Sequence, residues 1–420
     1  MTERRVRTLE VLPDRNQSTW QLSVIQLSGW TSLPILATSL IVLQENSLWG
    51  AILTIIVGNA LLWFLRLGII LMSHRKREST LDISRVYLGN FGSYFIAALL
   101  LISTLGWFIA QTATASEVLA QLVSLKENPQ IDQFSQISVL IGIISTFLCI
   151  DGIILLRRVA TLLFPILMIA FLGIIIAAPV HWPGGGELTL SLSGLSLVLG
   201  TNLGLTADLP TFFRHSKSLA TSIKALTLVQ LVSLALGLCS LYFGSILDKN
   251  FLINHDLQTA SLGHLLKISL TLFVFLSVIC ANVANVYSAS VGWELVAPSS
   301  LVGRKEYMIL GLGLTTLFIM IANIFSVNFL LNTSDSALVN LALVLIWGYL
   351  MRRKENRFPN AYEQIAYFCA WLLSSLANGL QFAGLIPLTI SPLLLGIAVI
   401  FVVLCISRLE RNLLDKVKKS

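Results

Sequence analysis

The sequence contains few charged residues. Asp, Glu, Lys and Arg together account for 12% of its 420 residues, whereas apolar residues account for 55%. The mean hydropathy of +0.83 is far above that of soluble globular domains. This composition excludes an ordinary soluble protein and predicts a chain that lies mostly within a lipid bilayer.

Sequence motifs of metal sites, disulfide frameworks and enzymes are also missing. The five cysteines all lie in apolar segments, without the CxxC spacing of a zinc site. No HExxH, Walker A or GxSxG pattern occurs. A glycine-rich stretch, 183–186, lacks the Lys and Ser or Thr that complete a phosphate-binding loop. We therefore expect a protein that is not an enzyme and that has no metal site and no cofactor.

The chain has a formal net charge of +7, but the placement of its basic residues indicates membrane topology rather than binding to nucleic acid. If the N-terminus lies in the cytoplasm, every Lys and Arg falls in a cytoplasmic segment except Arg66, Lys126, Lys249 and Lys267. Cytoplasmic loops of membrane proteins carry such an excess of Lys and Arg. We therefore expect both termini in the cytoplasm, a location in the inner or plasma membrane, and no nucleic-acid partner.

Twelve apolar stretches are long enough to cross a membrane, for which a helix needs about 20 residues. They cover approximately 20–43, 47–72, 91–122, 135–154, 159–179, 191–210, 221–245, 262–292, 307–326, 333–351, 361–380 and 385–407. The sequence thus predicts an all-α membrane protein with about twelve transmembrane helices. A cytoplasmic segment, 1–19, precedes them, and a cytoplasmic tail, 408–420, follows.

The first ten spans form two blocks of five. The first block covers 20–179 and the second covers 191–351, and two further spans lie in 361–407. Because five is an odd number, the second block enters the membrane from the opposite side. Two blocks related in this way form the inverted repeat that is typical of many secondary transporters.

The first span of each block contains residues that interrupt helices. These are 28–34 (SGWTSLP) and 200–204 (GTNLG), the latter followed by Pro210. Helices that break at matched positions indicate a substrate site near the middle of the membrane. Unwound backbone at that depth survives only where it lines a cavity or is buried in protein. Because Gly and Pro are common in membrane helices, each break on its own is a weak signal.

The third span contains an aromatic side chain and an amide one helical turn apart. Trp107 and Gln111 are spaced so that they lie on the same face of a helix. An indole can stack on a planar heterocycle, and a primary amide can donate to and accept from the edge of the ring. The alternative is an aromatic packing residue with a Gln that bonds to a neighbouring helix. The matched breaks in the first and sixth spans favour a binding site.

Between about residues 20 and 355 the chain resembles the nucleobase:cation symporter-1 family, and within it the cytosine permeases. The similar segments are 58–59 (GN), 106–108 (GWF), 206–209 (TADL) with Phe212, Arg214 and Lys217, 282–287 (NVANVY) and 349–353 (YLMRR). Each segment is short, but their order and spacing make a chance similarity improbable. The resemblance implies a LeuT-type fold, with a 5+5 inverted repeat and two additional C-terminal helices.

The resemblance also implies which residues contact the substrate. Trp107 matches the family's stacking tryptophan, and Gln111 matches an amide found in some members. In relatives the opposite wall is an aromatic residue in the sixth span, which corresponds here to Leu199, so that stacking would be one-sided. The substrate-binding residues implied in this way are Gly29, Trp30, Trp107, Gln111, Leu199, Thr201 and Ser277.

The family's cation site is only partly matched. Relatives hold sodium between carbonyl oxygens of the first span and a pair of hydroxyl side chains in the eighth span. That pair corresponds here to Cys280 and Ala281, which supply no oxygen, although hard cations prefer oxygen ligands. Hydroxyl groups of Ser288 and Ser290 lie further along the span. The residues implied for the cation site are Ser28, Thr31, Cys280 and Ala281, and both sodium and a proton stay open as the coupling ion.

Ionisable residues inside membrane spans are functional candidates. In this sequence they are Arg66, Glu117, Asp208, Glu294 and Asp335. The four acidic residues fall near the ends of expected spans, where we expect solvated charges, and we expect Arg66 to extend toward the cytoplasmic surface. Asp208, together with Arg214, is expected to order a gate at the inner end of the sixth span, or else to cap a helix.

The sequence therefore predicts a permease that imports a nucleobase-like heterocycle such as cytosine by alternating access, coupled to a cation. An importer of another small solute, such as a vitamin precursor or a small amine, stays open. So does a membrane sensor that keeps the fold without transport. The expected partners are a small-molecule substrate and the lipid bilayer, and the sequence does not indicate an oligomeric state.

Overall fold

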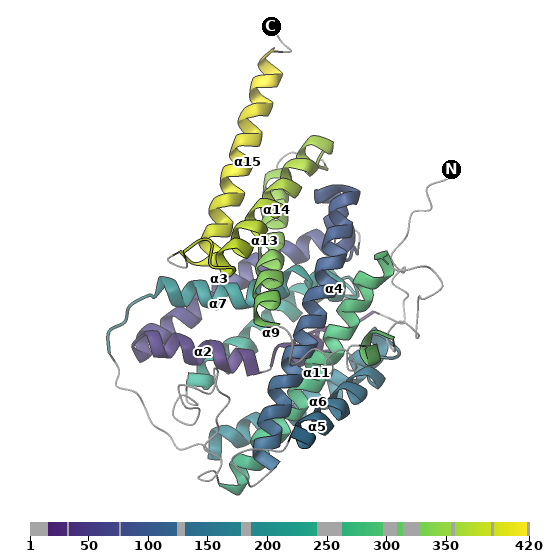
Figure 1. Cartoon of the computed structure of the whole chain (residues 1–420), viewed down its shortest axis with the longest axis vertical. Helices are drawn as coiled ribbons and strands as arrows, with labels where there is room; N and C mark the ends of the chain where they lie inside the picture. Colours follow the sequence, from purple (N-terminus) through teal and green to yellow (C-terminus); the bar gives the residue numbers. More distant parts are fainter. Residues whose placement is uncertain are drawn as a thin grey trace.

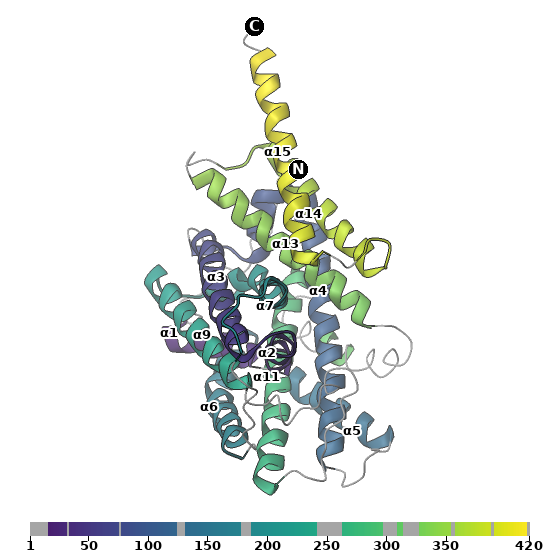
Figure 2. The same ribbon diagram turned by 90° about the vertical axis from the view of Figure 1, so that its left-hand side faces the viewer.

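The computed structural model describes residues 16–31, 33–74, 77–123, 131–177, 186–241, 263–296, 309–313, 327–353, 358–387 and 390–417. Within these ranges the chain is helical, as Figures 1 and 2 show from two directions. The helices are α1 (Thr19–Trp30), α2 (Leu33–Glu45), α3 (Leu48–His74), α4 (Thr80–Val123), α5 (Ile131–Phe147), α6 (Ile153–Ala177), α7 (Leu192–Ala207), α8 (Leu209–Phe213), α9 (Leu219–Ser240), α11 (His264–Val296), α13 (Val327–Arg353), α14 (Ala361–Phe382) and α15 (Pro392–Val417).

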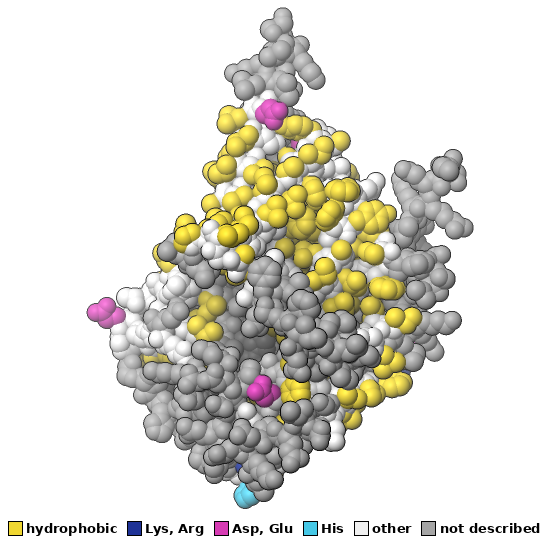
Figure 3. All heavy atoms as spheres, in the orientation of Figure 1, with side chains coloured by type: hydrophobic (Ala, Val, Ile, Leu, Met, Phe, Trp, Pro, Cys, Tyr) yellow, Lys and Arg dark blue, Asp and Glu magenta, His cyan; other side chains and the backbone are white. Residues whose placement is uncertain are grey.

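Eight of the described helices, namely α3, α4, α6, α9, α11, α13, α14 and α15, are long and apolar enough to cross a membrane. Large apolar side chains are exposed on their outer sides, for example Phe91 and Phe95 of α4, Leu373 and Leu376 of α14, and Phe401 of α15. Figure 3 shows apolar side chains spread over much of one face of the molecule. A water-soluble surface rarely exposes so much apolar area. The chain is therefore a multi-pass membrane protein.

The first expected span consists of two helices, α1 and α2. A capping box starts α1, in which the Ser18 hydroxyl accepts from the backbone N–H of Gln21 and the Gln21 side chain accepts from the backbone N–H of Ser18. The helix ends at Trp30, because Thr31 has a ψ of 75° and leaves the helical conformation. The predicted interruption within 28–34 is thus confirmed.

The predicted interruption at 200–204 is wrong. Helix α7 continues through Gly200 and Gly204 to Ala207, and the break comes at Asp208. The short helix α8 follows, with Pro210 in its first turn. Proline lacks a backbone N–H, so Pro210 cannot continue the hydrogen-bond ladder of α7 by donating to the carbonyl oxygen of Thr206, whereas membrane helices tolerate glycine. The proline, rather than the two glycines, therefore sets the position of the break.

Helix α4 bends at Gly89. This residue has a φ of +76° and a ψ of 177°, a conformation that glycine adopts far more readily than other residues. Nε2 of Gln364 in α14 donates to the carbonyl oxygen of Val86, just before the bend, at 2.9 Å. The straight part of α4 that follows the bend corresponds to the expected third span, 91–122.

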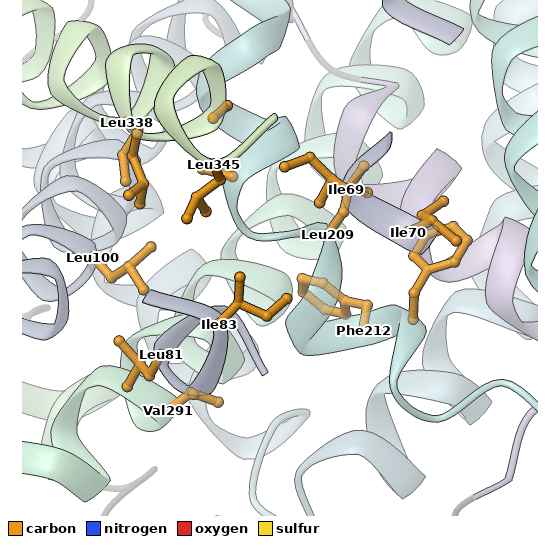
Figure 4. Packing of buried hydrophobic residues seen from close by; sticks show 14 of the residues in the cluster. Ile69, Ile70, Leu81, Ile83, Leu100, Leu209, Phe212, Val291, Leu338 and Leu345 are labelled. Carbon is orange, nitrogen blue, oxygen red and sulfur yellow. The ribbon is translucent and has the colours of Figure 1, made fainter. Parts of the chain in front are cut away.

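Helices α4 and α11 pack side by side through the molecule (Figures 1 and 2). Gly292 of α11 permits a close approach, since a Cβ atom there would lie 2.9 Å from the carbonyl oxygen of Ala97 in α4. The main buried apolar cluster joins this pair to α8 and α13, and Figure 4 shows Phe212 and Leu338 among its members. The pair therefore forms the support against which the interrupted spans pack.

Helices α13, α14 and α15 pack on one another, and the C-terminal end of α15 projects beyond the other helices (Figures 1 and 2). Nε1 of Trp371 in α14 donates to the carbonyl oxygen of Ala337 in α13 at 2.9 Å. The two C-terminal helices expected from the sequence are thus anchored to the second block by a buried hydrogen bond.

Some expected boundaries shift. The connection between the fourth and fifth spans is a turn at 148–152, so that α6 begins earlier than the expected 159. Helix α13 begins at Val327 rather than at 333, and α15 begins at Pro392 rather than at 385. The expected ninth span, 307–326, lies outside the described residues apart from 309–313.

Candidate substrate-binding site

A cavity lies between the two interrupted spans and the helices around them. Its lining residues belong to α1, α2, α4, α7, α8, α11 and α13, and to the break at Asp208. The cavity has a volume of about 120 Å³, counted as the space open to the centres of water molecules. One water needs roughly 10–15 Å³ of such space. The cavity therefore has room for several water molecules or for a small ring.

A carboxylate from α13 fixes the side chain of Trp107. The indole Nε1 donates to Oδ1 of Asp335 at 2.7 Å, and the hydroxyl of Ser103, one turn earlier in α4, donates to the same oxygen at 3.2 Å. Both Trp107 and Asp335 line the cavity. Gly106 lets the helices approach, since a Cβ atom there would lie 2.9 Å from Cδ2 of Leu331 in α13. The glycine beside the tryptophan thus helps to bring the carboxylate within reach.

The expectation that Asp335 is a solvated charge at the outer end of a span is wrong. Because α13 begins at Val327, Asp335 lies about two turns inside the helix. Its carboxylate accepts two hydrogen bonds from α4 and lines the cavity. Hydropathy placed the start of this span at 333, six residues too late, and Asp335 was therefore expected near its end.

Gln111 and Asn285 bring two amide groups to the cavity. Nδ2 of Asn285 in α11 donates to Oε1 of Gln111 in α4 at 3.5 Å, and both residues are part of the cavity wall. A primary amide has two donor hydrogens and an acceptor oxygen. Among the residues that the structure describes, nothing bonds to Nε2 of Gln111 or to Oδ1 of Asn285. One donor group and one acceptor group are therefore available to a ligand.

Trp30 lines the cavity at the end of α1 and is backed by Arg66 of α3. Cζ of Arg66 lies 4.0 Å from the centroid of the Trp30 ring, in a cation–π contact. The guanidinium donates to Oγ1 of Thr206 at 3.1 Å, to Oε1 of Gln230 at 2.7 Å and to the carbonyl oxygen of Asn202 at 3.2 Å. Because Arg66 covers one face of Trp30, a ligand can reach the ring only at its other face or at its edge.

The expectation that Arg66 extends to the cytoplasmic surface is also wrong. Its side chain is completely buried, and its hydrogen-bond partners are neutral groups of α7 and α9. Gln230 donates in turn to Oδ1 of Asn59 at 2.6 Å. A charge in a membrane interior needs such partners. The sequence could not show them, because they come from a distant part of the chain.

Asp208 occupies the break between α7 and α8, where three hydroxyl groups bond to it. Oδ1 accepts from Thr211 at 2.6 Å and from Thr80 at 3.4 Å, and Oδ2 accepts from Ser288. Thr80 begins α4 and Ser288 belongs to α11, so the carboxylate joins the interrupted sixth span to the central helix pair. Its backbone N–H also ends α7, by donating to the carbonyl oxygens of the preceding turn. Asp208 therefore both caps the helix and fixes the break.

Arg214, the other residue expected at an inner gate, does not line the cavity. Its side chain is buried and donates a hydrogen bond to Tyr287 of α11. The hydroxyl of Tyr287 also lies 3.1 Å from Nε2 of His215. The segment after α8 is thus held against α11 next to the site.

Five of the residues implied as substrate contacts line the cavity, namely Gly29, Trp30, Trp107, Gln111 and Thr201, whereas Leu199 and Ser277 do not. Leu199 packs against a separate apolar cluster that includes Leu62 and Val339. The hydroxyl of Ser277 is buried and donates to the carbonyl oxygen of Val274 at 3.0 Å. Besides Trp107, the aromatic side chains that line the cavity are Trp30 and Phe212, and Leu199 is not part of its wall.

The four residues implied for a cation site do not lie together in the cavity wall. Ser28 and Cys280 form a side-chain hydrogen bond with each other, and the Ser28 hydroxyl also donates to the carbonyl oxygen of Ile25 at 3.1 Å. The hydroxyl of Thr31 is buried and has no hydrogen-bond partner in the described part of the chain. Ala281 lines the cavity. Within the described ranges, no three His, Cys, Asp or Glu side chains are grouped so that they could hold a metal ion.

Several residues of the cavity wall were not expected from the sequence, namely Gln26, Ser103, Thr104, Asn202, Phe212 and Asn285, whereas Ser288 and Asp335 were named from the sequence but not as substrate contacts. Gln26 precedes Trp30 by one turn of α1, and Ser103 precedes Trp107 by one turn of α4. Residues at this spacing share a helix face. Helical periodicity from the two tryptophans would therefore have found both.

Comparisons with known proteins agree with this architecture. No protein-family profile and no curated protein sequence matches the chain. Mhp1, a nucleobase-cation-symport-1 family transporter, was solved in a closed conformation with bromovinylhydantoin bound; it matches with a TM-score of 0.62 and 17% identity, over 94% of this chain and 96% of that chain. Inward-facing Mhp1 matches with a TM-score of 0.59 and 17% identity, over 92% and 90%.

A mutant of the Eremococcus coleocola manganese transporter also matches, with a TM-score of 0.57 and 14% identity, over 92% of each chain. A nucleobase-cation-symport-1 family transporter and a manganese transporter thus share this architecture, and similarity at this level of identity concerns the fold. The chain has the LeuT-type transporter fold, in which two interrupted helices enclose a central cavity.

Proposed function

We propose that the chain is a secondary transporter of the nucleobase:cation symporter-1 family that imports a nucleobase-like planar heterocycle, such as cytosine, by alternating access. The observation that carries this proposal is that Trp107 and Gln111 line one cavity together with both interrupted spans. A fold shared with transporters and a cavity of this size support it.

The chemistry of the cavity suits a flat ring with polar edges. Trp30, Trp107 and Phe212 supply aromatic surface, and stacking of a base on an aromatic ring contributes about 1–3 kcal/mol. Gln111 and Asn285 supply amide donors and acceptors for the edge of the ring. The stacking in this proposal need not be one-sided, since Trp30 and Trp107 come from different helices.

The proposed topology follows the distribution of basic residues, with both termini in the cytoplasm and the segments 20–179 and 191–351 as inverted repeats. Spans one, two, six and seven would rock against spans three, four, eight and nine. Asp208 bonds across this division, because it lies in the sixth span and accepts from Thr80 and Ser288. Breaking and reforming these bonds is the step that we assign to gating.

The coupling ion in this proposal is a proton rather than sodium. Cys280 and Ala281 occupy the place of the family's hydroxyl pair, and the thiol is already hydrogen-bonded to Ser28. Thiol and methyl groups are poor ligands for a hard cation. Of the described residues in the cavity wall, we assign the coupling proton to Asp208.

Two other functions have less support. Manganese is the cargo of one structural relative, but no metal-binding cluster of His, Cys, Asp or Glu occurs among the described residues. A sensor that binds without transport would not need the hydrogen bonds of Asp208 to open, and an uptake measurement separates it from a transporter.

Uptake into proteoliposomes tests the proposal. Radiolabelled cytosine, uracil, hypoxanthine and hydroxymethylpyrimidine are offered to the purified protein, with sodium and proton gradients imposed separately. We expect accumulation of at least one of these rings, driven by the proton gradient. Binding without accumulation under either gradient would instead identify a sensor.

A further inference from the structure

We propose that Asp335 binds a positively charged N–H group of the substrate, so that the cargo is a planar heterocycle that is cationic at neutral pH. The inference rests on the proposed function, because it concerns the substrate of the same cavity. It narrows the substrate class from nucleobase-like rings in general to protonated ones, so that cytosine, which is neutral at this pH, would not be the preferred cargo.

Asp335 has one carboxylate oxygen available. Oδ1 accepts hydrogen bonds from Nε1 of Trp107 and from the hydroxyl of Ser103. Oδ2 has no hydrogen-bond donor among the residues that the structure describes, although the side chain lines the cavity. A carboxylate offers acceptor sites on both oxygens. A ligand in the cavity is therefore the group that can complete this carboxylate.

Among the described residues of the cavity wall, none supplies a cation for this carboxylate. The described residues that line the cavity include two carboxylates, Asp208 and Asp335, and no Lys, Arg or His. Arg66 stands behind Trp30 and directs its donors to Thr206, Gln230 and Asn202. A carboxylate removed from water needs a charged or hydrogen-bonding partner. A cationic ligand supplies both the charge and the donor.

Asp208 shows the contrast between a structural and a ligand-binding carboxylate. Its two oxygens accept from three hydroxyl groups, those of Thr80, Thr211 and Ser288. The bonds of Asp335 come from two residues of one helix and reach one oxygen. Of the two carboxylates in the wall, Asp335 is thus the one with an oxygen that accepts no hydrogen bond from a described residue.

The surroundings of Asp335 also suit a cationic ring. Both oxygens belong to one carboxyl group, so a group bound to Oδ2 lies close to the indole of Trp107. Cations are stabilised over the faces of aromatic rings, and Trp30 and Phe212, which line the same cavity, can offer a face to the charged ring. The amides of Gln111 and Asn285 remain for neutral polar atoms elsewhere on the ring. A ring that offered only lone pairs to Oδ2 would be repelled.

The experiment compares two rings of the same shape and different charge. 4-Aminopyridine is protonated at neutral pH, whereas aniline is neutral. Their affinities for the purified full-length protein are measured by calorimetry, together with the affinity for neutral uracil. The variants are Asp335→Asn, which removes the charge but keeps an acceptor oxygen for Trp107 and Ser103, and Glu117→Gln in α4, which lies outside the cavity wall.

We expect wild type to bind 4-aminopyridine about tenfold or more tightly than aniline, because a charge-assisted hydrogen bond is stronger than a neutral one. Asp335→Asn should abolish this difference and leave the affinity for uracil within about threefold. Glu117→Gln should keep the preference for the cation. Melting temperatures close to that of wild type would show that both variants are folded.

Equal affinity of wild type for the two amines would overturn the inference. So would an equal loss of affinity for all three rings in Asp335→Asn, because Asp335 would then act only by positioning Trp107. Uptake of neutral nucleobases without a preference for cations would remove this inference and leave the proposed transport function intact. If Trp107→Ala bound every ring as wild type does, the proposed site itself would fall.

Discussion

The indole Nε1 of Trp107 donates a hydrogen bond of 2.7 Å to Asp335, and this bond joins α4 of the first block to α13 of the second. A free tryptophan side chain would have to be ordered when a ligand binds. Because the bond holds the ring before binding, less conformational entropy is lost on binding. A residue of the second block therefore orients the indole of Trp107 in the first.

Substitution of Trp107 separates stacking from orientation. We expect Trp107→Ala to weaken binding of the transported ring by about tenfold or more, since stacking contributes roughly 1–3 kcal/mol. Trp107→Phe keeps an aromatic face but loses the bond to Asp335, so we expect an intermediate affinity. Equilibrium binding measures both, and unchanged melting temperatures show that the variants are folded. Wild-type affinity in Trp107→Ala would remove this residue from the site.

Two glycine variants test the helix packing. Gly292→Ala would place a Cβ atom 2.9 Å from the carbonyl oxygen of Ala97, a backbone atom that cannot move alone. We expect a loss of about 1–3 kcal/mol in stability from this overpacking, visible as a lower melting temperature. A Cβ atom at Gly200 would meet nothing within 4 Å, and α7 is continuous there. Gly200→Ala should therefore be neutral or stabilise the protein by up to about 1 kcal/mol. A lower melting temperature would instead indicate that the helix is interrupted within 200–204.

Replacement of the buried Arg66 by lysine should lower the stability of the protein. An ammonium group lacks the planar arrangement of donors, so Arg66→Lys cannot keep its bonds to Thr206, Gln230 and Asn202 together. We expect a loss of about 2–4 kcal/mol, measured by thermal melting in detergent. Arg158→Lys in α6, at an exposed position, is the matched control. Equal melting temperatures for the two variants would contradict the network.

Asp208 should matter more for transport than for binding. Asp208→Asn replaces one acceptor oxygen by an NH2 group, which cannot accept from the hydroxyl of Ser288 or Thr211. We expect a loss of about 1.5–3 kcal/mol from the hydrogen bonds at the helix break and a large loss of uptake, with ligand binding retained. Asp151→Asn, at an exposed position of the turn before α6, serves as the control. Normal uptake by Asp208→Asn would rule out its role in gating.

Sodium should change neither ligand binding nor uptake by the wild-type protein. Cys280 and Ala281 offer no side-chain oxygen, so we expect ligand affinity and uptake to be the same in sodium and in choline buffers. Introducing the hydroxyls with Cys280→Ser and Ala281→Thr together should produce a measurable dependence on sodium. Sodium-stimulated uptake by wild type would show instead that other oxygens form the cation site.

Helical periodicity and hydropathy predicted much of the fold. The expected first span breaks near Trp30 as predicted, because a run of Ser, Gly and Pro leaves few residues that favour a helix. The sixth span breaks at Asp208 instead of near Gly200, because a glycine permits a break without requiring one. Pro210 imposes the break through its missing N–H. The sequence showed both the glycines and the proline, but it did not show which of them would interrupt the helix.

The candidate site was predicted where one helix supplied the pattern and was missed where two helices did. Trp107 and Gln111 share a face of α4, and both line the cavity. Leu199 was assigned to the site by counting residues back along the chain. Such a count gives a position in the helix but not the direction of the side chain, and Leu199 packs against a separate apolar cluster. Asp335 reaches Trp107 only through the packing of α13 on α4, a contact that local sequence does not encode.

The partners of Arg66 constrain the order in which the membrane protein assembles. Arg66 lies in α3, but Asn202 follows it by 136 residues and Gln230 by 164 residues. An arginine at the centre of an inserting helix costs roughly 2.5–3.5 kcal/mol, which the strongly apolar remainder of α3 offsets. Of the described residues that contact Arg66, Trp30 alone is synthesised before it. After the first half of the chain has been inserted, Arg66 therefore still lacks its hydrogen-bond partners from α7 and α9. The two halves must come together before this side chain is fully bonded.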